Sequence, residues 1–143
     1  MNVYNVIDVS EYIITHEYGH NRGVTRYRLQ VLLYFVQAAF LMSGRGKCFD
    51  VQFEAKNSGP FLECVDNHYK DFNDSMIPPQ RGYSTVVVDE DKVIINGIVD
   101  YLGRCSTATL KKFCREHKPW KIGYFTDANK FISDNDMEKY FTQ

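Results

Sequence analysis

The sequence lacks the signals that mark secreted, membrane-spanning and nucleic-acid-binding proteins. Its four cysteines form no CxxC pair and no regular spacing, which predicts free thiols. The longest apolar stretch covers residues 29–42, whereas a membrane-spanning helix takes about 20 apolar residues. The first residues show neither the basic start nor the apolar run of a signal peptide. Lysines and arginines are scattered and the formal net charge is -1, which disfavours binding to nucleic-acid phosphates.

Apolar and aromatic residues, by contrast, are abundant. Hydrophobic residues make up 44% of the 143 residues and aromatic residues 15%, with ten tyrosines and ten phenylalanines. This is enough apolar material for one packed core, and the length suits one domain over residues 1–143. We therefore expect a single compact domain that is cytoplasmic and binds no membrane.

Apolar periodicity and capping residues predict a mainly α fold with a small β element, an α+β domain of about five to six helices. Helices are expected over residues 6–18, 25–43, 60–72, 90–102 and 106–116, with a short final helix capped by Ser133. Thr25 is the predicted N-cap of the second helix, and Gly44 and Gly46 are its predicted end. Alternating apolar and polar residues predict a strand over 49–55 and a β-like run over 84–88. The predicted inward face of the helix over 90–102 consists of Val93, Ile94, Ile98, Val99 and Leu102.

The most informative segment is the helix predicted over residues 25–43. Because it is apolar on nearly every side, we expect it to be surrounded by protein. It nevertheless carries a line of polar residues at helical spacing, Tyr27, Gln30, Tyr34 and Gln37. An unpartnered buried amide costs on the order of 1–3 kcal/mol, so these groups form an internal network, lie along a solvated edge, or meet a partner. Tyrosine is enriched at interfaces, which keeps the partner interpretation open.

The order Leu-Gln-x-Leu-Leu-Tyr-Phe-x-Gln-Ala over residues 29–38 resembles the signature of the Panacea (SocA-like) domain family. The resemblance continues upstream over residues 8–14 and downstream over residues 53–60, where Gly59 and Pro60 resemble the family's strand-to-helix turn. It extends nearly to the end of the chain, because the Pro-Trp pair ending at Trp120 and the residues up to Phe141 follow in the family's order.

The chain departs from the family's pattern at one position within residues 29–38 and at another within residues 53–60. Val31 stands where the family usually has a basic residue, and Lys56 where it usually has tryptophan. Phe61 replaces a smaller aliphatic residue. If the family's residues at the first two positions grip a partner, the partner or its docking differs in this protein.

The resemblance implies a non-enzymatic antitoxin that binds and neutralises a co-encoded toxin, or passes it to a protease as an adaptor. Family members also occur as phage-associated proteins, so an inhibitor of a host defence protein is a second hypothesis. A transcription repressor is disfavoured by the net charge and by the lack of a clear helix-turn-helix. No cofactor is expected. The predicted protein-binding residues are Tyr27, Gln30, Tyr34, Gln37, Lys56, Gly59, Pro60 and Trp120.

An alternative from another class comes from His16, Glu17 and His20, which match H-E-x-x-H. In zinc hydrolases this spacing places two imidazoles one helical turn apart on the metal, while the glutamate activates a water. Gly19 lies inside the match where the helix is expected to end, and no convincing third ligand follows. We therefore predict no metal ligands and no catalytic residues, with a zinc-dependent hydrolase as the alternative.

Trp120 is the only tryptophan of the chain. Because tryptophan is highly buried on average, we expect Trp120 to anchor the C-terminal segment against the core. The alternative is an exposed interface hot spot, a role for which tryptophan is enriched.

Overall fold

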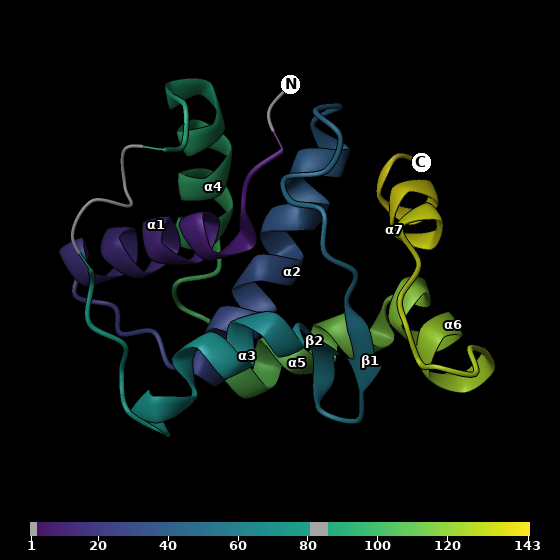
Figure 1. Ribbon diagram of the computed structural model, residues 1–143. Coiled ribbons are helices and arrows are strands. Elements are labelled where there is room, and N and C mark those ends of the chain that lie inside the picture. Colours follow the sequence, from purple (N-terminus) through teal and green to yellow (C-terminus); the bar gives the residue numbers. More distant parts are fainter. Residues whose placement is uncertain (1–2, 81–85) are drawn as a thin grey trace.

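The computed structural model describes residues 3–80 and 86–143 (Figure 1). Over these residues the fold is mainly helical, with seven α-helices and one two-stranded antiparallel sheet, which confirms the predicted α+β class. The helices are α1 (Val6–Gly19), α2 (Arg26–Met42), α3 (Glu63–Tyr69), α4 (Asp89–Tyr101), α5 (Thr107–Glu116), α6 (Lys118–Thr126) and α7 (Asp134–Phe141), and a 3-10 turn, η1 (Lys70–Phe72), extends α3. The strands are β1 (Glu54–Lys56) and β2 (Gly59–Phe61).

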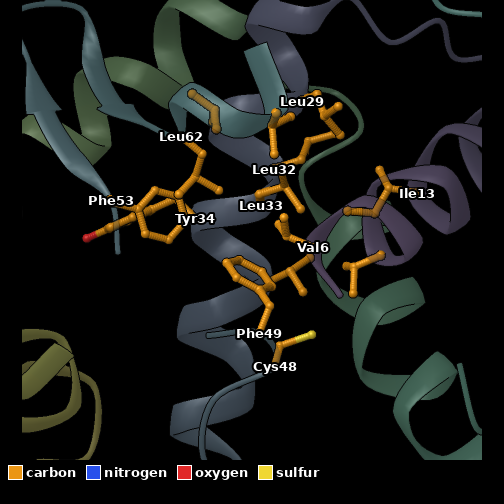
Figure 2. Packing of buried hydrophobic residues seen from close by; sticks show 14 of the residues in the cluster. Val6, Ile13, Leu29, Leu32, Leu33, Tyr34, Cys48, Phe49, Phe53 and Leu62 are labelled. Atoms are coloured by element: carbon orange, nitrogen blue, oxygen red, sulfur yellow. The ribbon is translucent and has the colours of Figure 1, made fainter. Parts of the chain in front are cut away.

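Helix α2 is the centre of the fold. It contacts α1, α3, α4, α5, α7 and β2 (Figure 1). Figure 2 shows its side chains meeting Val6 and Ile13 of α1 and Phe49 of the segment that follows α2. Each fully buried aliphatic or phenylalanine side chain contributes roughly 1.5–3 kcal/mol, so the apolar surface of α2 supplies much of the stability. Among the described residues, none of the helices combines the length and hydropathy needed to cross a bilayer.

The helix ends follow the predicted capping residues. The Thr25 hydroxyl accepts from the Arg28 amide at 3.2 Å, and Ser133 caps α7 in the same way. Gly44, at φ +74°, ends the stretch after α2 in a left-handed conformation that glycine adopts without strain. These ends are local devices, which explains why the sequence alone locates them.

The segment from 49 to 61 corrects two predictions. The strand expected over 49–55 is only Glu54–Lys56, and the residues expected to start a helix form β2 instead. Lys56 pairs with Gly59 across a two-residue turn, and Gly59 has φ +139°, which favours glycine. Ala55 and Pro60 lie opposite each other in the hairpin, but the Ala55 amide donates away from Pro60, to the Lys130 carbonyl at 2.6 Å. The missing amide proton of Pro60 therefore removes no hydrogen bond between the two strands.

Helix α6 was missed by the sequence prediction. The sequence predicts no helix between the one ending at residue 116 and the one capped by Ser133, and α5 does end at Glu116. A new helix nevertheless begins at Lys118, with Pro119 in its first turn. The first amides of a helix have no carbonyl partner within it, so proline is tolerated there.

The buried face of α4 also differs from the predicted one. Val93 is 71% exposed, whereas Ile95 is fully buried; Ile94 and Ile98 are partly buried. The buried stripe is Asp91, Ile95, Val99 and Leu102. On this buried face the Asp91 carboxylate is paired with Arg45 of the segment after α2, with 2.6 Å between Arg45 Nε and Asp91 Oδ1.

The β-like run predicted over 84–88 lies only partly within the described residues. Residues 84 and 85 fall outside them, and residues 86–88 form no strand.

Candidate functional site

Two members of the polar line on α2 are engaged inside the protein. Gln37 accepts from the amides of Cys48 and Phe49 at 2.8 and 3.3 Å, and its Nε2 donates to the Phe49 carbonyl at 2.9 Å. Gln30 holds Leu62 in the same way, accepting from its amide at 2.6 Å and donating to its carbonyl at 3.0 Å. Both glutamines are buried. Their side chains complete the hydrogen bonding of backbone outside the regular helices and strands.

Tyr34 lies between the two glutamines and is fully buried. Its hydroxyl is 3.1 Å from Nδ1 of His117. Burial raises the pKa of Tyr34 well above its ordinary value and lowers the pKa of His117. The tyrosine hydroxyl therefore stays protonated and forms a hydrogen bond with the imidazole, and the tautomer of His117 sets which of the two groups donates. The contacts of Gln30, Tyr34 and Gln37 are those that the internal-network interpretation predicts.

Tyr27, at the N-terminal end of the line, reaches the surface. It is 38% exposed, and the Arg26 guanidinium lies 4.9 Å from its ring centroid. Tyr27 and Gln30 of α2 line one pocket of about 300 Å³ together with Pro60 of β2, which is distant from them in sequence. Among these three residues it is Tyr27 that opens the pocket to the surface. The pocket lining is Arg26, Tyr27, Gln30, Ser58, Pro60, Phe61, Asp66 and Lys111.

The remaining predicted residues lie at the β-hairpin. Trp120 is 5% exposed, and its Nε1 donates to the Lys56 carbonyl at 3.0 Å. Its ring stacks on Tyr124 with 4.7 Å between centroids. Trp120 therefore anchors α6 to β1, in agreement with the core-anchor interpretation. The side chain of Lys56 is exposed, with its ammonium 4.8 Å from the Phe61 ring centroid, while Gly59 is buried.

The end of α1 carries the H-E-x-x-H match, and the structure adds a third residue to it. His16 and His20 lie one turn apart, with 4.3 Å between ring centroids. Asp100 of α4 lies beside them, with its Oδ1 2.8 Å from His16 Nε2. One ligating atom from each of the three residues lies within 4.8 Å of the other two. The sequence does not reveal this grouping, because Asp100 is 84 positions from His16.

Glu17 is directed away from this cluster into a buried ion pair. Its carboxylate is fully buried and accepts from Arg22, at 3.0 Å from Nε to each oxygen and 2.8 Å from Nη2 to Oε1. Arg22 Nη2 also contacts Asp100 Oδ1. Because Arg22 engages both oxygens of Glu17 inside the protein, the geometry does not favour Glu17 as a base that activates water. The hydrogen bond from His16, aided by that from Arg22, lowers the pKa of Asp100.

An uncharged groove lies beside the C-terminal half of α2, which α4 and α7 flank in Figure 1. It has a volume of about 730 Å³, and its lining contains no Asp, Glu, Lys or Arg. Two lining residues, Met42 and Tyr101, are 66% and 81% exposed. The sequence prediction missed this groove, since apolar residues on helices are ordinarily assigned to the core. The lining is Phe35, Ala38, Ala39, Met42, Ser43, Ile98, Tyr101, Leu102, His117, Tyr140, Phe141 and Gln143.

No protein-family model, curated protein or solved structure matches this chain. The likeness to the Panacea family therefore stays a prediction based on the motifs quoted above.

Proposed function

We propose that the protein is a non-enzymatic protein-binding domain that neutralises a co-encoded toxin by forming a direct complex. The observation that carries the proposal is the uncharged groove between α2, α4 and α7. Exposed apolar surface that collects in one concave place is typical of protein-interaction sites. The motif resemblance to Panacea antitoxins supplies the class of partner.

The lining of the groove favours a partner that presents apolar side chains. Aromatic residues and methionine are enriched at interfaces, and Phe35, Met42, Tyr101, Tyr140 and Phe141 all contribute to this lining. The unbranched thioether of Met42 adapts its shape to an incoming side chain. A groove lined without Asp, Glu, Lys or Arg suits the apolar face of an amphipathic helix, since binding leaves no such side chain buried and unpaired.

The binding assay uses the product of the adjacent gene as the partner. Co-expression is expected to restore growth that the partner alone arrests, and the two proteins are expected to co-purify as a one-to-one complex. Tyr101→Glu places a charge in the groove and is expected to weaken the complex at least about tenfold, because an interface hot spot contributes about 2 kcal/mol or more and a factor of ten corresponds to about 1.4 kcal/mol. The measurement is a titration of the purified proteins.

Val93→Glu is the matched control, since Val93 lies on the same helix, is 71% exposed and does not line the groove. It should bind as the unmodified protein does. Tyr27→Ala tests the pocket beside the hairpin separately. If Tyr101→Glu and Met42→Glu bind the toxin unchanged, the groove is not the docking site. If the free protein is a dimer that Tyr101→Glu dissociates, a second copy of the chain occupies the groove instead.

If the protein is instead a phage-encoded inhibitor of a host defence protein, its partner is a protein other than the neighbouring gene product. In that case the adjacent gene product neither arrests growth nor binds, which overturns the antitoxin proposal.

A further inference from the structure

We infer that His16, His20 and Asp100 form a binding site for a divalent transition-metal ion of the zinc class, which ties the last turn of α1 to α4. The inference goes beyond the proposed function and is independent of it. It begins from the approach of one ligating atom from each residue to within 4.8 Å of the other two.

The hydrogen bonding of His20 leaves the correct nitrogen for a metal. Its Nδ1 is 2.8 Å from the His16 carbonyl oxygen, and a carbonyl only accepts, so Nδ1 carries the proton. The lone pair of the neutral ring is then on Nε2, for which the described part of the chain provides no hydrogen-bond partner. An imidazole that donates one N–H to a carbonyl while its other nitrogen binds the metal is the usual arrangement in protein metal sites.

The spacing of the three residues is close to that of a coordination shell. Two ligands at 2.0–2.1 Å from a tetrahedral ion lie about 3.3 Å apart. The present separations are 2.8 Å between His16 Nε2 and Asp100 Oδ1 and no more than 4.8 Å among all three ligands. Adjustment of exposed side chains closes the difference, because His20 is exposed and the side chain of Asp100 is 46% exposed. Water has access to complete the shell.

The charges around the site favour a cation. Both histidines lie at the C-terminal end of α1, where the helix dipole is negative and the last carbonyls lack partners within the helix. Arg22 occupies a supporting position, since it holds Glu17 and contacts the Asp100 carboxylate. Oδ1 of Asp100 receives both the His16 and the Arg22 contacts, so Oδ2 is the oxygen that the described hydrogen bonds leave available to the ion. Carboxylate ligands in metal sites are commonly hydrogen-bonded in this way.

The donor set selects the class of ion. Two imidazole nitrogens and one carboxylate oxygen suit zinc and its chemical relatives, whereas calcium and magnesium prefer oxygen ligands. The role is one of binding and of linking two helices, because Glu17 is engaged by Arg22 and is not free to activate a metal-bound water.

The test is titration of tag-free, metal-stripped protein with Zn²⁺ and, separately, with Co²⁺, whose visible absorption reports imidazole ligands. All titrations use a background protein that carries both Cys64→Ser and Cys105→Ser. These two thiols are not fully buried, and thiolates bind zinc strongly. We expect one ion per chain, no binding of Mg²⁺ at the same concentration, and a rise in Tm with Zn²⁺. His20→Gln and Asp100→Asn are each expected to lower the affinity at least about tenfold.

His68→Gln is the matched control, since His68 is also exposed and lies on α3, outside the cluster. It should bind Zn²⁺ with unchanged affinity. The inference is overturned if the background protein binds no Zn²⁺, or if His20→Gln binds it as tightly as His68→Gln does. The toxin-binding assay is read separately, so a failure there leaves the metal result intact.

Discussion

The polar line of α2 and the histidine cluster at the end of α1 use the same helical spacing for opposite purposes. Gln30 and Gln37 lie two turns apart and direct their amides onto backbone groups inside the protein. His16 and His20 lie one turn apart beside Asp100 at the surface, where Nε2 of His20 has no hydrogen-bond partner among the described residues. Spacing therefore brings polar groups together, whereas burial decides whether they serve the fold or a ligand.

The energetic consequence of this difference is that the two regions respond differently to substitution. In the α2 line, removing one side chain leaves several buried backbone groups without partners, each at a cost of about 1–3 kcal/mol. In the cluster, water replaces whatever a substitution removes. Substitutions in the α2 polar line should therefore change the free energy of unfolding, whereas substitutions in the histidine cluster should change ligand binding.

The largest expected effect is that of Gln37→Met. Methionine fills a similar volume but makes no strong hydrogen bond, so the amides of Cys48 and Phe49 and one carbonyl lose their partner. We expect the free energy of unfolding to fall by about 3 kcal/mol or more, measured by urea denaturation. Gln52→Met makes the same change at an exposed position and should stay within about 0.5 kcal/mol. Equal effects at both positions would contradict the framework role of Gln37.

A smaller effect on stability is expected from pH, through His117, which contacts Tyr34 of the α2 line. Burial lowers the pKa of His117 in the folded protein, so the unfolded chain takes up a proton at higher pH than the folded one. Stability should therefore fall as the pH drops below about 6.5 and stop falling once the pH is below the folded pKa, with this residue contributing at most about 1.4 kcal/mol per pH unit.

The measurement is the free energy of unfolding between pH 7.5 and 5, compared with that of His117→Asn. The variant should show a shallower loss across this range. An identical slope in both proteins would mean that His117 is not the group responsible.

The smallest expected effect on stability is that of His20→Gln. The residue is exposed, so the free energy of unfolding of the metal-free protein should change by no more than about 0.5 kcal/mol. Thermal unfolding with and without Zn²⁺ then separates the two regions: the substitution should remove the metal-dependent rise in Tm while leaving the metal-free Tm in place. A large loss of stability without metal would place His20 in the framework together with Gln37.

The sequence predicted most of the helices because their signals are local. Thr25 caps α2 through an amide three residues away, and Gly44 ends the helical stretch by its own backbone conformation. The hairpin was predicted wrongly because Gly59 and Pro60 suit a helix start as well as a strand. Two long-range interactions select the strand over the helix: pairing with β1, and the hydrogen bond from the Leu62 amide to Gln30, 32 positions away.

The functional regions divide along the same line. His16 and His20 are visible in the sequence as a spacing, and Tyr27 and Pro60 as motif residues, but the sequence contains no signal for Asp100 beside the histidines. The sequence gives no sign of the groove either, because Met42 and Tyr101 look like ordinary apolar residues of a helix. Only the packing of α2 against α4 and α7 shows that both side chains stay exposed.

By itself, the sequence determined the α+β class, the caps and glycines that bound the helices, and an apolar helix around which the fold is built. These follow from interactions between residues within one or two turns of each other. Only the tertiary structure decided that Gln30, Tyr34 and Gln37 bond internally, that Asp100 lies beside two histidines, and that a groove without Asp, Glu, Lys or Arg stays open. Each of these depends on which segments lie against each other, and that is set by long-range packing that local sequence does not encode.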